Sequence, residues 1–254
     1  MTSYRSVAFI GGGRIARILL EGWRVSEKMP DSILVVEPDE SALALLRDIA
    51  LEVRAVDVGD LGACDVVFLA VHPPAFKGVL ERLADAVSPD ALVVSLAPKV
   101  KATAIAEALG TDRVARMIPN APSVIGAGYN PVFFSGGIDR ESKQALKKMF
   151  APWGEQPEVA EENLEAYAIV TAMGPTYFWY EIQKLRELSV SFGLEQEAAD
   201  EAVRKMLDGA VRCLLAKGPS AMDLIPVRPL EELEPTVTSA FETKLTGTFE
   251  KLTS

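Results

Sequence analysis

The segment that most constrains this chain is a glycine-rich stretch near its start, V-A-F-I-G-G-G-R-I-A-R at residues 7–17. Its apolar residues 7–10 predict a short buried strand, and a helical pattern follows the glycines. Gly11, Gly13 and Ala16 fit the G-x-G-x-x-G/A fingerprint of dinucleotide-binding units. The first glycine permits a sharp turn, the second lets a pyrophosphate approach the backbone, and the small third residue lets the helix pack closely. We therefore predict a dinucleotide site here; the alternative is a glycine turn without a ligand.

A second buried-strand pattern supports this prediction. The run S-I-L-V-V at residues 32–36 is followed by Glu37, 26 residues after Gly11. This is near the position where the motif places an acid that binds ribose hydroxyls. The alternative is a surface glutamate after a strand.

The acidic residues around Glu37 also bear on the cofactor. A carboxylate there accepts hydrogen bonds from the adenosine ribose and repels a 2′-phosphate, and Asp39 and Glu40 add to that repulsion. The sequence thus favours NAD over NADP. Arg14 or Arg17 would weaken this preference if either folded back towards a phosphate.

The rest of the first 160 residues alternates apolar runs with helical patterns. This alternation predicts an α/β fold with a Rossmann-type, doubly wound parallel sheet covered on both faces. The further predicted strands are residues 53–56, 66–71, 91–97, 114–118, 131–135 and 156–160.

After residue 160 the pattern becomes almost wholly helical. We therefore predict a dinucleotide-binding domain at residues 1–160 and a helical substrate and dimerisation domain at 161–254. The longest helix is expected at residues 196–217, and its apolar surface is broad for so small a domain. Burying that surface against a second copy predicts a homodimer.

Composition excludes several classes of function. A formal net charge of −10 argues against general binding of nucleic acids or acidic membranes. No apolar run approaches the ~18 residues of a membrane span, and no signal-peptide pattern precedes the first strand. The two cysteines have no metal-ligand partners at close spacing, so no zinc site is indicated. We expect a cytoplasmic protein.

Two polar residues follow predicted strands at the edge where ligands of such sheets bind. His72, the sole histidine, follows strand 66–71, and Asn120 follows strand 114–118 in a loop with two prolines. His72 is a candidate cofactor contact or proton donor, and Asn120 offers both a donor and an acceptor to substrate. The alternatives are a loop histidine that ends a strand and an ordinary rigid turn.

With these landmarks placed, the chain resembles the pyrroline-5-carboxylate reductase family over most of its length. The family's opening F-I-G-G-G-N-M-A resembles residues 9–16, and its A-V-K-P resembles A-V-H-P at 70–73. Its R-x-M-P-N-x-P-x-x-x-G-x-G resembles residues 116–128, with Met and Ile in shifted order. Its G-S-G-P-A-Y, which opens the helical dimerisation domain, resembles A-M-G-P-T-Y at 172–177.

The sequence differs from the family's pattern mainly in the segments that bind substrate in that family. The family's T-S-P-G-G-T-T turn, whose hydroxyls and amides receive the imino acid, is replaced here by V-R-P-L-E-E-L at residues 227–233. Ala172 and Met173 remove further small polar surface. Arg228 either replaces the lost donors as a carboxylate clamp or is a surface arginine.

The resemblance implies an NAD(P)-dependent reductase that transfers a hydride to the C=N bond of a cyclic imino acid. The alternatives are reduction of a different carbonyl or imine, or a nucleotide-binding regulatory protein without turnover. Candidate catalytic residues are Tyr177 and Asn120, and candidate substrate residues are Met173 and Arg228. For Tyr177, packing in an aromatic cluster is the alternative. The predicted cofactor-binding residues are Ile10, Gly11, Gly12, Gly13, Arg14, Ile15, Ala16, Glu37, Ala70, Val71, His72, Pro73 and Ala97.

Overall fold

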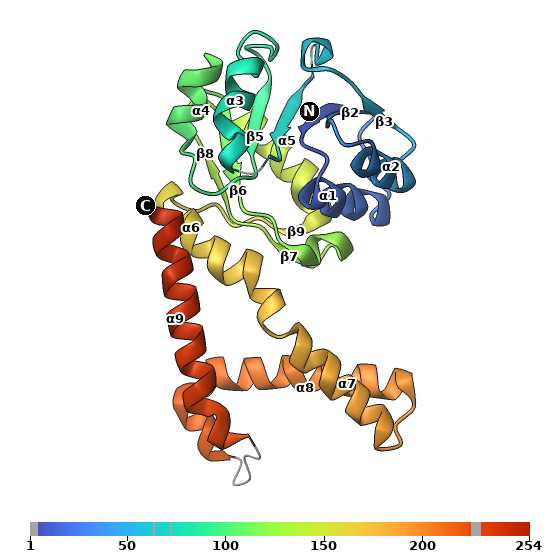
Figure 1. Cartoon of the computed structure of the whole chain (residues 1–254), viewed down its shortest axis with the longest axis vertical. Helices are drawn as coiled ribbons and strands as arrows, with labels where there is room; N and C mark the ends of the chain where they lie inside the picture. The colour runs from blue at the N-terminus through green and yellow to red at the C-terminus, as the bar shows by residue number, and fades with distance from the viewer. Residues whose placement is uncertain (1–4, 63, 72, 225–229) are drawn as a thin grey trace. The chain divides into compact units, whose positions relative to one another are not determined.

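The computed structural model describes residues 5–62, 64–71, 73–224 and 230–254, and the chain divides into two compact units (Figure 1). The first unit ends at Met173 and also includes Phe249–Ser254; the second is Gly174–Thr248. The predicted domain boundary near residue 160 stays a prediction. No helix in the described ranges is long and apolar enough to cross a membrane.

The first unit is built on one seven-stranded sheet. Its order is β3-β2-β1-β4-β5-β6-β8, with every pair parallel except β6 and β8. The strands are β1 (Ser6–Ile10), β2 (Ser32–Val36), β3 (Val53–Ala55), β4 (Val66–Leu69), β5 (Leu92–Ser95), β6 (Val114–Met117) and β8 (Val132–Phe134). Chain order reverses between β1 and β4, which makes their carboxyl ends the ligand-binding edge of such a sheet. The predicted doubly wound sheet is confirmed.

Helices cover both faces of this sheet. One face packs against α1 (Arg14–Val25), α2 (Glu40–Ile49) and α5 (Arg140–Phe150), and the other against α3 (Pro73–Leu83) and α4 (Ala102–Leu109). The strands are buried on both sides, which is why their sequences read as continuous apolar runs.

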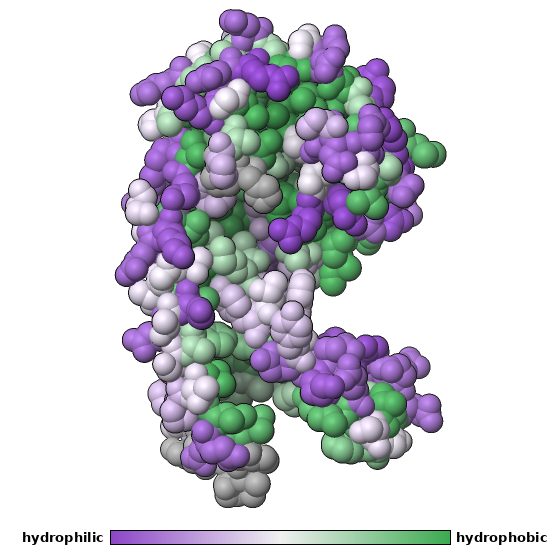
Figure 2. All heavy atoms as spheres, viewed as in Figure 1, coloured by the Kyte–Doolittle hydropathy of each residue, from purple (hydrophilic) through white to green (hydrophobic). Residues whose placement is uncertain are grey.

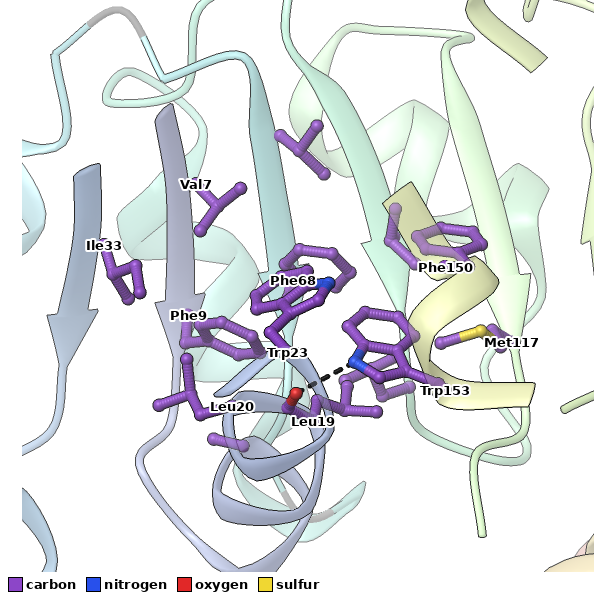
Figure 3. Close-up of a cluster of buried hydrophobic side chains, with 14 of the residues drawn as sticks. Val7, Phe9, Leu19, Leu20, Trp23, Ile33, Phe68, Met117, Phe150 and Trp153 are labelled. Carbon is purple, nitrogen blue, oxygen red and sulfur yellow. Dashed lines mark hydrogen bonds between the residues drawn. The ribbon is translucent and has the colours of Figure 1, made fainter. Parts of the chain in front are cut away.

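An aromatic cluster fixes α1 against the sheet (Figure 3). Trp23 lies 4.7 Å from Trp153 between ring centroids, and Phe9 stacks on Phe68 at 4.8 Å. The Trp153 indole N–H donates to the carbonyl of Leu19 at 2.8 Å, the bond drawn dashed in Figure 3. Trp153 lies far along the chain in the short helix η3 (Ala151–Trp153), so this cluster ties the end of the sheet domain to its first helix.

The segment after α5 departs from the prediction of a strand at residues 156–160. The structure has β9 (Gly154–Glu155) paired with β7 (Gly128–Tyr129), and beyond it a single bridge between Val132 and Glu158. Pro157 lacks an N–H group and so cannot donate to a ladder. The predicted strand 66–71 is also shorter, because β4 ends at Leu69.

The remainder is helical, as predicted. Besides η3, the short helical elements in the described residues are η1 (Val58–Asp60), η2 (Ala121–Ile125), η4 (Glu161–Asn163), α6 (Leu164–Tyr167), the π-helix η5 (Ala168–Met173), η6 (Gly174–Tyr177), η7 (Gly218–Leu224) and η8 (Glu231–Leu233). The long helices are α7 (Trp179–Ser191), α8 (Gln196–Lys217) and α9 (Glu234–Thr253). Helix α8 spans the predicted residues 196–217.

The second unit buries little of its apolar surface. Of its described hydrophobic residues, Ala199 and Val203 alone are buried. Tyr180 is 86% exposed and Leu215 is 82% exposed, and Figure 2 shows hydrophobic side chains on the outer surface of α7 and α8. The helices of this unit therefore leave wide apolar faces uncovered.

Candidate functional site

The glycine loop between β1 and α1 packs closely against the end of β4, at the carboxyl edge of the sheet. Gly11 has φ of 101°, and a Cβ on it would lie 2.7 Å from the carbonyl oxygen of Ala70. An L side chain is therefore excluded both by conformation and by space. This contact brings the predicted cofactor residues Gly11, Ala70 and Val71 together where β1 and β4 end.

Gly13 has the opposite environment. Apart from its own neighbours in the chain, no described residue has an atom within 4 Å of where its Cβ would be, and Gly13 is the N-cap of α1. The first turn of α1 has no acidic residue, and Arg14 is exposed at its start. Open space beside free N–H groups at a positive dipole end fits the pyrophosphate of a dinucleotide. Ala16 is fully buried, which lets α1 pack on the sheet.

Glu37 joins this loop to the end of β2. Its Oε2 accepts a hydrogen bond from the Gly12 N–H at 2.8 Å, and its Oε1 accepts one from the Asp39 N–H at 3.0 Å. A Cβ on Gly12 would lie 3.0 Å from the Glu37 Cγ. The carboxylate is thus fixed beside the glycine loop, an arrangement that the fingerprint did not predict. Its contact with ribose stays a prediction.

The strands β4 and β5 supply the rest of the predicted cofactor edge. Ala70 donates its N–H to the carbonyl of Ile10 at 2.8 Å, and Ala97 is buried in the same cluster of side chains as Ile10. Ile15 is partly buried against the core on the other face. Pro73 opens α3, and His72 lies outside the described residues.

Both the oxygen and the nitrogen of the Asn120 side-chain amide make hydrogen bonds within the protein. It is 6% exposed, and its Nδ2 donates to the carbonyl of Thr171 at 3.1 Å. Its Oδ1 accepts from the Tyr129 N–H at 3.3 Å and from the Ser123 hydroxyl at 3.4 Å. These contacts join the loop after β6 to the π-helix η5, so the geometry favours a role in holding the loop. A catalytic role for Asn120 stays a prediction.

A buried ion cluster that the sequence did not predict lies behind this edge. Arg116 on β6 is completely buried, and its guanidinium nitrogens lie 3.0 Å from Glu161 and 2.7 Å from Glu165. An arginine inside the apolar run V-A-R-M was the available signal, because a buried cation requires a carboxylate partner. The sequence did not identify its partners, because Glu161 and Glu165 lie in a segment whose acidic residues are typical of the start of a helix.

The two carboxylates also hold the loop after β5. The Glu165 Oε1 accepts from the Lys99 N–H at 3.0 Å, and the Glu161 Oε1 accepts from the Ala102 N–H at 2.7 Å. Burial alone would raise the pKa of Glu165, but the hydrogen bond and charge of Arg116 outweigh it and lower that pKa. The loop after β5, at the edge predicted to bind the cofactor, is thus anchored to a buried charge.

The remaining candidates lie towards the chain's second half. Met173 ends η5, and Tyr177 belongs to the second unit, where its ring meets Phe241 edge-on at 5.7 Å between centroids. Burial raises the pKa of the Tyr177 hydroxyl. Arg228 lies outside the described residues. The roles of all three in binding or chemistry stay predictions.

Comparison with known proteins adds to this geometry. Residues 6–99 match a family described as NADP oxidoreductase, coenzyme F420-dependent. Over 224 residues the chain is 28% identical to the pyrroline-5-carboxylate reductase of Corynebacterium melassecola, covering 86% of this chain and 83% of that protein. The structure of a pyrroline-5-carboxylate reductase from Coxiella burnetii matches with a TM-score of 0.71 and 26% identity over 100% of both chains. That of Plasmodium falciparum pyrroline carboxylate reductase with NADP bound has a TM-score of 0.75 at 18% identity, over 99% of this chain and 97% of that one, and shows likeness of fold alone.

A parallel sheet with a glycine loop at its first crossover, together with these similarities, defines an NAD(P)-dependent oxidoreductase with a Rossmann-type nucleotide domain. Within this class, the chain is similar to pyrroline-5-carboxylate reductases over most of its length.

The lowered pKa of Glu165 makes a prediction about pH. Because the folded state favours the charged carboxylate, its contribution is present above the ordinary glutamate pKa of about 4.3 and is lost as pH falls below it. We expect Glu165→Gln to lower the free energy of unfolding at pH 7 by about 3–5 kcal/mol, because Arg116 loses a charged partner, and this difference from wild type to shrink towards pH 3. Urea unfolding across that range measures it.

Glu158→Gln is the matched control, since Glu158 pairs with Lys143 and Lys147 at the surface. Exposed pairs contribute about 0–1 kcal/mol, so this variant should change little at any pH. A difference between Glu165→Gln and wild type that stays constant from pH 7 to pH 3 would contradict the account.

Proposed function

We propose that this protein reduces pyrroline-5-carboxylate to proline, transferring a hydride from NADH to the C=N bond of the ring. The observation that carries the proposal is the open backbone at Gly13, at the ligand-binding edge of a chain that matches pyrroline-5-carboxylate reductases over most of its length. A nicotinamide cofactor supplies a hydride at its ring C4 when bound. The imine carbon takes that hydride, the nitrogen takes a proton from solvent, and the product is the saturated ring.

The chain's own residues bind and orient in this scheme. The free N–H groups at the start of α1 would hold the pyrophosphate, and the loops after β4 and β5 would border the nicotinamide half. Hydride transfer depends mainly on holding the two reacting carbons in place, so a rigid edge is the chief requirement. Gly11 packed on Ala70 and the anchored loop after β5 supply that rigidity.

The cofactor preference rests on Glu37. Its carboxylate is fixed beside the glycine loop, where it retains acceptor capacity for the ribose hydroxyls of NADH. A 2′-phosphate would meet this charge together with Asp39 and Glu40, and water excluded from a bound ligand strengthens the repulsion. We infer that NADH is the preferred reductant.

The turnover test uses purified protein, pyrroline-5-carboxylate and either NADH or NADPH, with Gly13→Val as the paired variant. Because the Cβ of residue 13 meets open space, Gly13→Val should fold normally while blocking the pyrophosphate. We expect wild-type turnover and a loss of NADH affinity in the variant of about 10- to 100-fold, the size of one or two charge-assisted hydrogen bonds.

Circular dichroism and thermal melting confirm that Gly13→Val is folded. Cofactor binding without turnover in the wild type would favour a different substrate or a regulatory protein. Unchanged NADH affinity in Gly13→Val would remove the glycine loop from the site.

Glu37→Gln tests the preference for NADH. Glutamine keeps an oxygen that accepts from the Gly12 N–H but removes the charge. We expect the ratio of kcat/KM for NADPH to that for NADH to rise about tenfold, or ~1.4 kcal/mol. The exposed Glu52→Gln serves as control, and a ratio in Glu37→Gln equal to that of wild type would remove Glu37 from the ribose site.

We also propose that the second unit pairs with a second copy of this chain. Its helices expose Tyr180, Phe192 and Leu215 at 78–86%, far more apolar surface than a stable helical unit leaves in water. Two copies meeting through the same faces would cover it in both, as two-fold interfaces do.

Light scattering coupled to size exclusion measures the oligomer. We expect a dimer for wild type and for Leu51→Asp, whose side chain is 93% exposed in the first unit, and a monomer for Leu215→Asp, because a charge would be buried at the interface. A monomeric wild type, or a dimer that survives Leu215→Asp at low concentration, would contradict this interface.

A further inference from the structure

Lys99 has an unusual backbone conformation at the cofactor edge. Among described residues other than glycine, Glu27 and Lys99 have positive φ, at 57° and 76°. Glu27 is explained by its place just after α1, where its N–H bonds to Arg24 and the next N–H to Trp23 in a common helix ending. Lys99 lies in the loop after β5 and follows no helix.

The local sequence makes Lys99 more unusual. It follows Pro98, and a proline before a residue of positive φ is the pattern of a type II turn, whose second central position favours glycine or asparagine. Lysine there costs free energy that glycine would not. Strain of this kind persists where the surroundings impose it, and it gathers at binding sites.

Hydrogen bonds to neighbouring side chains hold the backbone of Lys99 in this strained conformation. The Lys99 N–H is held by Glu165, and the Ala102 N–H three residues on is held by Glu161. Both carboxylates are paired with the buried guanidinium of Arg116. One buried cation therefore fixes both ends of the segment that presents Lys99, while the lysine side chain itself is exposed.

Acidic and basic residues lie on different sides of the carboxyl edge of the sheet. Glu37, Asp39 and Glu40 follow β2, on the adenosine side of the switch between β1 and β4. Among the described residues directly after β4, β5 and β6, the cations are Lys99 and Lys101. An anionic substrate approaching a chain of net charge −10 needs a local cation on the nicotinamide side.

We propose that Lys99 binds the carboxylate of the substrate and so sets specificity for an anionic ring. This proposal rests on the proposed function. The ammonium forms a charge-assisted hydrogen bond with the carboxylate and fixes the ring over the edge of β5. The Arg116–Glu165 pair acts on the backbone of Lys99 and is a positioning element, without contact to substrate.

The test compares two substrates that differ by the carboxylate alone, pyrroline-5-carboxylate and 1-pyrroline, with saturating NADH. Lys99→Ala removes the charge and keeps a strained residue, Lys99→Gly removes both charge and strain, and Lys99→Arg keeps the charge. Lys101→Ala is the matched control, an exposed lysine two residues on that makes no side-chain cap to α4.

We expect Lys99→Ala and Lys99→Gly to raise the KM for pyrroline-5-carboxylate about 10- to 100-fold, the size of one charge-assisted hydrogen bond. The KM for NADH and the kinetics with 1-pyrroline should stay unchanged, Lys99→Arg should recover much of the loss, and Lys101→Ala should match wild type. Melting temperature gives a readout apart from activity: Lys99→Gly should melt above wild type, and Lys99→Ala should not.

The experiment separates failure of the Lys99 role from failure of the proposed reductase activity. Wild-type turnover of pyrroline-5-carboxylate with an unchanged KM in Lys99→Ala would overturn the role of Lys99 and leave the proposed function standing. A raised KM for NADH, or an equal loss with both substrates, would also overturn it. No turnover of either substrate by folded, NADH-binding wild type would overturn the proposed function, and the role of Lys99 with it.

Discussion

The close approach of Gly11 to the carbonyl of Ala70 is the constraint on which the ligand-binding edge depends. A side chain at residue 11 would lie 2.7 Å from that oxygen, so glycine alone lets β1 turn into α1 against the end of β4. The turn then leaves Gly13 in open space at the start of α1, and Glu37 holds the intervening Gly12 N–H. Three neighbouring glycines thus have three different physical tasks.

A second constraint stabilises the other half of the edge. Arg116 carries a charge into a completely buried position, which is unfavourable unless its partners remain in place. Glu161 and Glu165 supply them, and each also accepts a backbone N–H from the loop after β5. Removing one member of such a cluster typically costs about 3–5 kcal/mol. The shape of the loop after β5 is therefore tied to the stability of the fold.

Local patterns sufficed for most of the fold. The apolar runs predicted the sheet, and the long apolar face predicted α8 at residues 196–217. The predicted strand at 156–160 was wrong because Pro157 cannot donate to a ladder and the segment keeps only one bridge. The charge cluster was missed because Glu161 and Glu165 lie 45 and 49 residues from Arg116 in the chain. Contacts at such separation leave no periodic signal, and the hydrogen bond that the Gly12 N–H donates to Glu37, 25 residues away, is of the same kind.

We propose above that the glycine-loop edge holds a nicotinamide cofactor for direct hydride transfer to an imine carbon. Reaction of purified protein with pyrroline-5-carboxylate and NADH carrying deuterium at the transferred C4 position tests it most directly. We predict proline with one deuterium on the ring carbon that was doubly bonded to nitrogen, found by mass spectrometry and NMR. Proline formed without deuterium, or NADH bound by the protein with no proline formed, would contradict the account.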